Sequence, residues 1–212
     1  MRQACVFCQP EALDGVLDQT EHLFLLADNA PLVEGHVLIV PRDHYACYGA
    51  VPAKLDAEYL ELKTKVSRFM KDCYRLPLFF EHGVYRQTVA HAHLHALPLS
   101  VSRRLADHAL TQKGLPAVSQ DDLRRWYETN GKYFYLEKPN ADYNTHFGAI
   151  FPPDESVYFR VQAVLREGAE SHGGWLPQAL RRQIGRPQME RLKATWHTWQ
   201  QRQPADGVAT PD

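Results

Sequence analysis

The stretch "HAHLHALPLS", residues 91–100, places histidine at every second position and then continues into apolar residues. Side chains at alternate positions of a β-strand point to the same face, so the spacing predicts a strand with His91, His93 and His95 on one face. A neutral imidazole is a nucleophile and a protonated one is a proton donor, and both forms are accessible near neutral pH. The row therefore predicts a site that attacks and holds a phosphate group, or one that binds a metal ion. A surface strand with incidental histidines is the alternative.

The residues before this row predict an α+β domain. Apolar runs at residues 23–27 and 36–40, with turn residues between them, predict two strands, and "LPLFFEHGV" at residues 76–84 predicts a third. Apolar residues three or four apart from Leu55 to Cys73 predict an amphipathic helix of about five turns. Strands in this order around one helix favour a mostly antiparallel sheet.

The chain divides into four predicted parts. We expect the α+β domain at residues 1–105, a connecting segment at 106–130, a mainly helical C-terminal extension at 131–202 and a disordered tail at 203–212. The connecting segment contains a short helical pattern in "SQDDLRRWYETNG", and "KYFYLEKP" predicts a strand at the start of the extension.

Two helices are predicted within the extension. In "DESVYFRVQAVLREG" the helix begins after Asp154, a possible N-cap, and stops at Gly168. In "GRPQMERLKATWHTWQQR" the helix has Pro187 at its start, where a missing backbone N–H is tolerated. Apolar residues recur along one side of this second helix, which predicts that it packs on the rest of the protein.

Composition narrows the class of protein. Of the 212 residues, 44% are hydrophobic and 23% are charged, as in ordinary globular proteins, and the net charge of −1 gives no general attraction to nucleic acid or to a membrane. No window is apolar enough for a membrane span, and "MRQACVFCQPEALDG" lacks the apolar centre of a secretory signal. We therefore expect a cytoplasmic protein without disulfides.

"HAHLHAL" has histidines separated by single apolar residues and followed by two more apolar residues. In this it resembles the histidine triad superfamily. "QTVAHAHLHALP" resembles the branch of that superfamily that hydrolyses dinucleoside polyphosphates, and "ADNAPLVEGHVLIVPRDH" resembles its earlier strand pair. The resemblance covers residues 4–100.

The resemblance implies catalytic roles for the middle and last histidines. His93 would attack the α-phosphorus of a nucleotide and form a nucleotidyl-imidazole intermediate. His95 would contact phosphate oxygens and assist proton transfer. Gln87 and Thr88 would donate hydrogen bonds to the phosphate or to the bridging oxygen, although Gln87 could also be an ordinary loop amide.

The resemblance also implies a nucleoside pocket. Asp28 would receive the ribose hydroxyls, although a turn residue is the alternative at this position. The apolar strand at residues 23–26, including Leu25, would form part of the base pocket. His36 would lie near the nucleotide and support the triad.

Two residues separate Cys5 from Cys8 in "CVFC", a spacing that suits one metal ion; a redox pair is the rival interpretation. In the superfamily that the chain resembles, such a pair often completes a zinc site with two histidines, which implies His44 and His91 here. Four protein ligands close the coordination sphere, so this Zn²⁺ would be structural. An empty pair is the alternative.

The leading hypothesis is a nucleotidyl hydrolase or transferase that cleaves at the α-phosphate of a nucleoside polyphosphate or a related adenosine conjugate. Dinucleoside polyphosphates are the first expected class of substrate and nucleoside phosphoramidates are the second. Phosphorolysis and nucleotidyl transfer are alternatives to hydrolysis. The alternative is a nucleotide- or RNA-binding module, because the extension faintly resembles that of the CwfJ-like proteins. We expect a homodimer or a two-domain monomer, with no membrane partner.

Overall fold

The computed structural model describes residues 5–99, 115–117, 119–139, 146–170 and 176–203. The predicted disordered tail lies outside the described residues from position 204 onward. Within the described ranges, no helix is long and apolar enough to cross a membrane.

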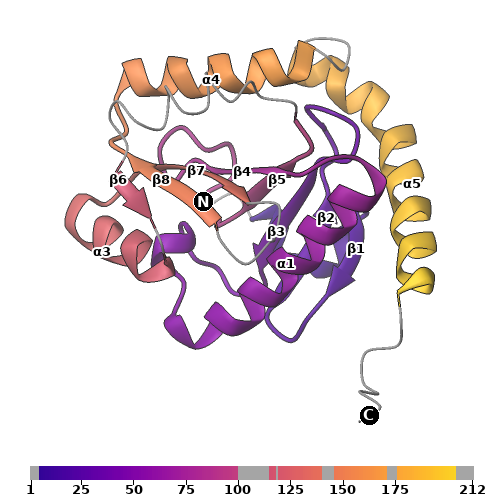
Figure 1. The fold of residues 1–212 in the computed structure, drawn as a ribbon, viewed down its shortest axis with the longest axis horizontal. Coiled ribbons are helices and arrows are strands. Elements are labelled where there is room, and N and C mark those ends of the chain that lie inside the picture. Colours follow the sequence, from indigo (N-terminus) through magenta and orange to yellow (C-terminus); the bar gives the residue numbers. More distant parts are fainter. Residues whose placement is uncertain (1–4, 100–114, 118, 140–145, 171–175, 204–212) are drawn as a thin grey trace, which may run out of the picture.

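Within the described residues, the fold combines eight strands with four long helices (Figure 1). The strands are β1 (Val16–Gln19), β2 (Leu23–Ala27), β3 (Val37–Pro41), β4 (Leu78–Glu81), β5 (Leu94–Leu97), β6 (Leu115–Ala117), β7 (Phe134–Pro139) and β8 (His146–Phe151). The helices are α1 (Asp56–Cys73), α3 (Gln120–Asn130), α4 (Glu155–Glu170) and α5 (Gln178–Arg202). A 3-10 turn at Val6–Cys8 precedes them.

All eight strands form one sheet in the order β1-β2-β3-β5-β4-β7-β8-β6, and every neighbouring pair is antiparallel. The predicted α+β class with a mostly antiparallel sheet is therefore confirmed. The boundary near residue 105 stays a prediction, but β7 from the extension is hydrogen-bonded directly to β4 from the first part. The extension thus continues the sheet as well as adding helices.

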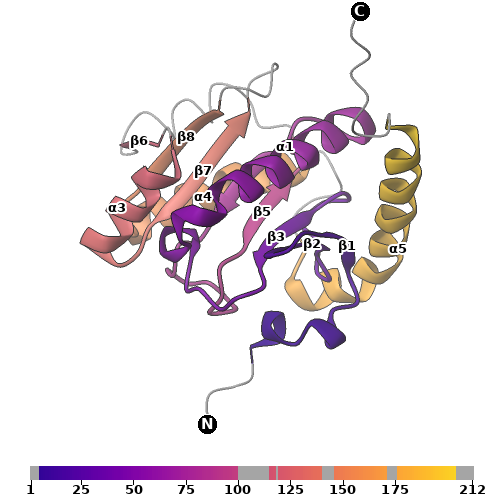
Figure 2. The ribbon, with the colours of Figure 1, turned by 90° about the horizontal axis from the view of Figure 1, so that it is seen from below.

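The two faces of the sheet are covered by different elements (Figure 2). Helix α1 covers one face, and α5 runs beside the β1 edge of the sheet; apolar side chains of both helices form one large core with inward residues of six strands. Helix α4 packs on the part of the opposite face formed by β4, β5, β7 and β8. The N-terminal segment packs over β2 and β3 on that opposite face. Because side chains alternate along a strand, each strand residue is committed to one of these two faces.

Helix α4 continues past the predicted stop at Gly168, which is a correction. A Cβ at Gly168 would lie 3.0 Å from Cβ of Leu99, so the glycine permits close packing of the helix on the sheet and does not end it. Helix α5 also differs, since it begins nine residues before Pro187. The helix changes direction along its length (Figure 2), as expected for a helix with an internal proline.

Three strands were missing from the prediction, namely β1, β6 and β8. β1 is short and half-exposed, with a bulge between Val16 and Asp18, and therefore lacks a clear alternation of apolar residues. β8 contains a glycine, which weakens a strand pattern. β5 begins only at Leu94, so His91 and His93 precede the strand and do not lie within it as predicted.

Buried polar contacts fasten the extension to the first part of the chain. Glu81 on β4 accepts hydrogen bonds from the Tyr48 N–H (2.8 Å) and the Tyr133 hydroxyl (2.5 Å). Lys63 on α1 forms a buried ion pair with Glu137 on β7. Unpaired charges and polar groups are unstable in an apolar interior, so these contacts fix the relative position of the joined elements.

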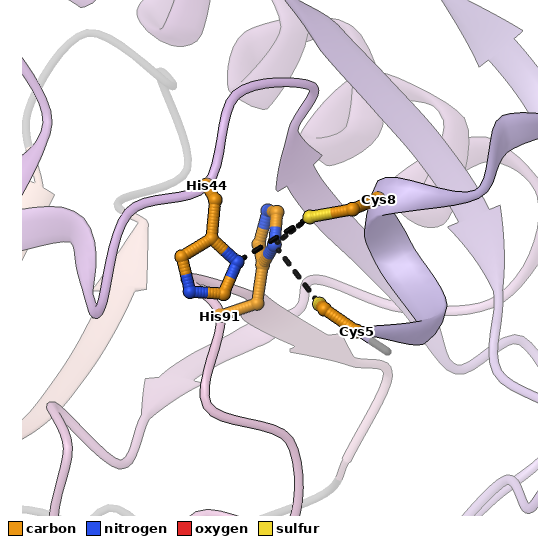
Figure 3. A group of neighbouring side chains, drawn as sticks. All are labelled: Cys5, Cys8, His44 and His91. Atoms are coloured by element: carbon orange, nitrogen blue, oxygen red, sulfur yellow. Dashed lines mark hydrogen bonds between the residues drawn. The ribbon is translucent and has the colours of Figure 1, made fainter. Parts of the chain in front are cut away.

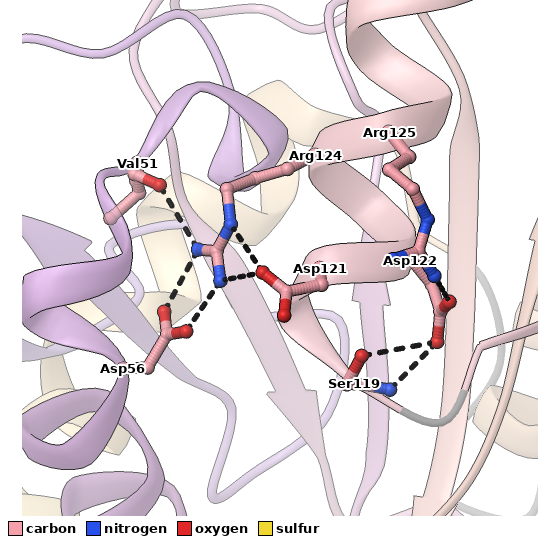
Figure 4. A network of polar contacts seen from close by, with 7 residues as sticks. All are labelled: Val51, Asp56, Ser119, Asp121, Asp122, Arg124 and Arg125. Atoms are coloured by element: carbon pink, nitrogen blue, oxygen red, sulfur yellow. Dashed lines mark hydrogen bonds and ion pairs between the residues drawn. The ribbon is translucent and has the colours of Figure 1, made fainter.

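Helix α3 is fastened by exposed and half-buried contacts at its N-terminus (Figure 4). Ser119 and Asp122 form a capping box. The Arg124 guanidinium donates to both carboxylate oxygens of Asp56, to Asp121 and to the Val51 carbonyl. The helix is thereby tied to the start of α1.

Candidate active site

The three histidines of the row serve two different sites. The Nδ1 atom of His91 faces Cys5 and Cys8, whereas His93 and His95 line a cleft on the sheet face opposite α1. A backbone hydrogen bond from the Ala92 N–H to the Tyr45 carbonyl (2.7 Å) holds this segment just before β5. Because residues 91–93 precede β5, the three imidazoles do not share one face, and only those of His93 and His95 reach the cleft.

His93 is held as a neutral imidazole with one free nitrogen. Its Nδ1 lies 2.6 Å from the His91 carbonyl oxygen, which can only accept, so the proton is on Nδ1. Burial lowers the pKa of His93, and this favours the neutral form. Its Nε2 consequently carries a lone pair, as a nucleophile requires.

A chain of hydrogen bonds fixes the proton of His95. The Leu32 N–H donates to Nδ1 of His36 (3.2 Å), so the ring proton of His36 is on Nε2. That Nε2–H donates to Nδ1 of His95 at 2.9 Å, which leaves the His95 proton on its own Nε2. Burial lowers the pKa of His36 to about 4 and that of His95 well below its usual value, so both rings are neutral. Of this pair, His93 thus presents a nitrogen acceptor to the cleft and His95 presents an N–H donor.

Two neighbours of His36 set its position. Gly35 has φ +89°, a conformation that favours glycine, and a Cβ there would lie 3.0 Å from Pro98 and 3.3 Å from the Tyr74 ring, so a side chain before this histidine would be strained. Asp28 donates its backbone N–H to the His36 carbonyl (3.1 Å), and its Oδ2 lies 3.7 Å from Nδ1 of His36.

The predicted substrate-binding residues are only partly brought together. Asp28 lines the cleft and is also a turn residue, because its Oδ1 accepts from the Ala30 N–H at 2.6 Å. Thr88 lines the cleft as well. Gln87 instead accepts from the Val84 N–H (3.1 Å) and donates to the Ala46 carbonyl (3.0 Å), so here it shapes the loop.

Leu25 does not face the cleft. It is fully buried in the core between the sheet and α1, on the opposite face from the histidines. Its strand neighbour Leu26 and Leu38 on β3 line the cleft in its place. The predicted strand therefore reaches the cleft through Leu26 and not through Leu25, because successive side chains of a strand face opposite sides of the sheet.

The cleft has a volume of about 720 Å³, within the range of small-molecule sites. Sequence reasoning missed one of its histidines, His82, which follows β4 and donates from Nδ1 to the Tyr85 carbonyl (3.0 Å). Burial lowers the pKa of His82 to about 4. A single histidine after a strand has no spacing that links it to the row. The extension supplies a whole wall of the cleft: Tyr158, Gln162, Leu165, Gln178, Arg181, Arg182, Arg186 and Met189.

Cys5, Cys8, His44 and His91 form a second cluster (Figure 3). Nδ1 of His91 lies 3.4 Å from Sγ of Cys5 and 3.5 Å from Sγ of Cys8, and Nδ1 of His44 lies 3.3 Å from Sγ of Cys8. A tetrahedral zinc ion holds sulfur and nitrogen ligands about 3.5 Å apart. The four donor atoms therefore fit one tetrahedral metal ion.

The backbone prepares His91 for this arrangement. Its Nε2 lies 2.8 Å from the Pro41 carbonyl oxygen and must donate a proton to it. The lone pair of Nδ1 is then directed to the cysteines, as in protein metal sites where a backbone carbonyl fixes the ligand tautomer.

The His93 and His95 pair, on an antiparallel sheet, agrees with the resemblance of the sequence to histidine triad proteins. Comparison with protein-family models gives the same result, because the HIT domain model matches residues 9–101. This segment of the chain is thus similar to the HIT domain.

Curated proteins from several organisms resemble the chain. The adenosine 5′-monophosphoramidase of Saccharomyces cerevisiae is 29% identical over 99 residues, covering 45% of this chain and 62% of the yeast protein. The zinc finger CCCH domain-containing protein 59 of Oryza sativa is 26% identical over 164 residues, covering 69% of this chain and 26% of the rice protein. The second match is longer than the HIT domain, so it continues into the extension. The chain spans less than two thirds of either relative.

Among solved structures, a hypothetical histidine triad nucleotide-binding protein from Sulfolobus tokodaii is 20% identical, with a TM-score of 0.41. The likeness covers 79% of this chain and 93% of that protein.

Proposed function

We propose that the protein is a nucleotidyl hydrolase or transferase that cleaves at the α-phosphate of an adenosine conjugate through a nucleotidyl-His93 intermediate. The observation that carries this proposal is the His93 ring, whose Nδ1–H is held by the His91 carbonyl while its Nε2 is free in the cleft. The name of the yeast relative, an adenosine 5′-monophosphoramidase, supports a nucleotide substrate.

The proposed reaction has two displacements at phosphorus. Nε2 of His93 attacks the α-phosphorus, a nitrogen–phosphorus bond forms, and the leaving group departs with the bonding electron pair and takes a proton from water. Water then attacks the same phosphorus, loses a proton, and releases His93 and a nucleoside monophosphate. If another nucleophile replaces this water, the same intermediate gives transfer.

His95 stabilises the charge that develops in both steps. Its Nε2–H is a hydrogen-bond donor that His36 holds in place before the substrate arrives, so little reorganisation is needed in the transition state. Asp28, at the rim beside this pair, is proposed to accept the ribose hydroxyls. Thr88 is proposed to donate to the phosphate.

We also propose that Cys5, Cys8, His44 and His91 bind Zn²⁺. Four protein ligands leave no open position, so the ion would stabilise the fold and take no part in the reaction. By joining the N-terminal turn to the residue two before His93, the site would fix the segment that carries the nucleophile.

The catalytic proposal is tested by AMP release from diadenosine triphosphate, diadenosine tetraphosphate and adenosine 5′-phosphoramidate. His93→Ala should lower the rate by roughly 10³-fold or more, the size of effect seen when a nucleophile is removed. His197→Ala, an exposed histidine on α5, is the matched control and should keep full activity. Intact mass spectrometry without acid should detect a nucleotidyl adduct on the parent protein only. Equal rates for parent and His93→Ala would rule out this nucleophile.

The zinc proposal is tested by metal analysis of purified protein. We expect about one zinc per chain in the parent and much less in Cys8→Ser. The half-buried Cys73 lies outside the cluster, so Cys73→Ser should retain the metal. Equal zinc contents in parent and Cys8→Ser would contradict the proposed ligand set.

A further inference from the structure

The turn between β2 and β3 packs against the start of α5, a helix of the C-terminal extension. A Cβ at Gly185 would lie only 2.6 Å from the Asn29 carbonyl oxygen and 2.8 Å from Cδ of Pro31. The helix can approach so closely only because residue 185 has no side chain. One helical turn before Gly185, Arg181 donates a hydrogen bond from Nη1 to the Ala30 carbonyl oxygen. Helix α5 thus contacts three successive residues of the turn.

The Arg181 side chain is part of the cleft wall and is held in a fixed position. Its Nε donates to the Leu176 carbonyl oxygen (3.1 Å), while Nη1 reaches Ala30. Ala30 is buried, and a buried carbonyl oxygen needs a hydrogen-bond partner, which Arg181 supplies. Burial lowers the pKa of Arg181, and the charge of Asp28 acts in the opposite direction, so the guanidinium lies near this carboxylate.

Ala30 connects Arg181 to Asp28. Its carbonyl oxygen accepts from Arg181, and its N–H donates to Oδ1 of Asp28 at 2.6 Å. The two contacts use the two polar groups of one residue, so a shift of Ala30 away from α5 would also turn the Asp28 carboxylate. Each carboxylate oxygen has two lone pairs, so Oδ1 can keep this bond and still accept from a ligand.

We propose that Arg181 is a positioning residue, which through Ala30 directs the Asp28 carboxylate toward a ribose with free 2′ and 3′ hydroxyls. This inference rests on the proposed function, because it takes Asp28 as the acceptor of those hydroxyls. A carboxylate that is oriented before the ligand arrives loses less conformational freedom on binding, so the affinity is higher. The C-terminal extension therefore takes part in selecting the nucleoside, although Arg181 lies outside residues 9–101.

Calorimetry with AMP and 2′,3′-dideoxy-AMP tests this role in the full chain supplied with zinc. The two nucleotides carry the same phosphate and base, and only AMP has ribose hydroxyls. In the parent, AMP should bind about fivefold or more tightly than dideoxy-AMP, the size expected of hydrogen bonds to a charged group. Arg181→Met removes the donor to Ala30, so this preference for AMP should fall to about twofold or less.

Arg182→Met is the matched control. Arg182 is exposed and lines the same cleft, so its loss removes the same charge and leaves the contact between Arg181 and Ala30 in place. Any effect of charge on the phosphate is equal for the two nucleotides, so this variant should keep the preference of the parent. Arg181→Lys keeps a donor and should restore most of the preference. In Asp28→Ala protein, Arg181→Met should change the preference no further, because both substitutions act on one carboxylate.

A preference that survives in Arg181→Met, or a parent that shows no preference, would overturn the inference. If Arg181→Met does not fold, as judged by circular dichroism, Arg181→Gln takes its place with the same expectation, because its side chain is uncharged and shorter. Turnover separates this inference from the proposed function. A parent that releases no AMP from the three adenosine conjugates contradicts the proposed function, while the binding preference still decides the role of Arg181. A parent that releases AMP but binds both nucleotides equally contradicts only the role of Arg181.

Discussion

Glu81 should make the stability of the protein depend on pH across the neutral range. Its side chain is buried, and burial raises the pKa to about 7 from 4.5, although hydrogen bonds from Tyr133 and the Tyr48 N–H oppose the shift. In the unfolded chain the carboxyl ionises near pH 4.5, whereas in the folded protein it keeps its proton until about pH 7. Between these values the unfolded state binds fewer protons, so rising pH favours unfolding.

The size of this change in stability follows from the difference between the pKa values of Glu81 in the folded and unfolded protein. A difference of about 2.5 pKa units corresponds to about 3 kcal/mol of unfolding free energy, which is lost between about pH 4.5 and 7 and stays lost above pH 7. Glu81→Gln resembles the protonated acid and cannot ionise. Relative to the parent, this variant should therefore gain about 3 kcal/mol as the pH rises through that window.

Urea unfolding followed by tryptophan fluorescence at several values between pH 4.5 and 8 measures this difference directly. Other titrating groups cancel when the variant is compared with the parent. Glu58→Gln is the control: burial raises the pKa of Glu58, but hydrogen bonds from Thr20 and His22 outweigh this and lower it. Its contribution is lost as the pH falls below about 4.5, so its difference from the parent should stay flat in the measured range. A flat difference for Glu81→Gln as well would refute the argument.

Three further substitutions test the packing and the hydrogen-bond chain. Gly185→Ala places a Cβ 2.6 Å from the Asn29 carbonyl and should lower the free energy of unfolding by about 1–3 kcal/mol in urea titrations. An unchanged midpoint of urea unfolding would mean that α5 can shift freely. Trp196→Ala empties a fully buried site on α5 and should cost about 3–5 kcal/mol in the same titration, and a loss below 1 kcal/mol would contradict its place in the core. His36→Ala removes the Nε2–H that orients His95, so kcat for AMP release should fall about tenfold or more with a stable fold by circular dichroism, and unchanged kcat would exclude the positioning role.

Regular patterns were enough to predict much of the fold. The periodicity from Leu55 to Cys73 identified α1, and apolar runs bounded by turn residues identified β2, β3 and β4. Proline and glycine misled the prediction in the extension. Pro187 lies inside α5 and Gly168 inside α4, because tertiary packing against the sheet outweighs the local preference of these residues.

Some residues of the candidate site could also be predicted from local motifs, and others could not. Spacing and family resemblance led to His93, His95 and the Cys–His cluster, all of which lie in recognisable motifs. The arginines of α5 and His82 reach the cleft only through the folded arrangement of distant segments. Leu25 was predicted one position away from the residue of β2 that lines the cleft. Neighbouring residues of a strand face opposite sides of the sheet, so Leu25 lies in the core instead.

The packing of α5 on α1 also bears on how the protein is made. The rings of Trp196 and Trp199 lie 4.7 and 5.4 Å from that of Phe69, and the Trp199 indole N–H donates to Asp72 at 2.8 Å. These partners are more than a hundred residues apart in the sequence, so α1 is synthesised long before the helix that covers it. Until residue 199 has left the ribosome, the nascent chain keeps an apolar helix face open to other molecules, which calls for chaperone protection or for fast completion of synthesis.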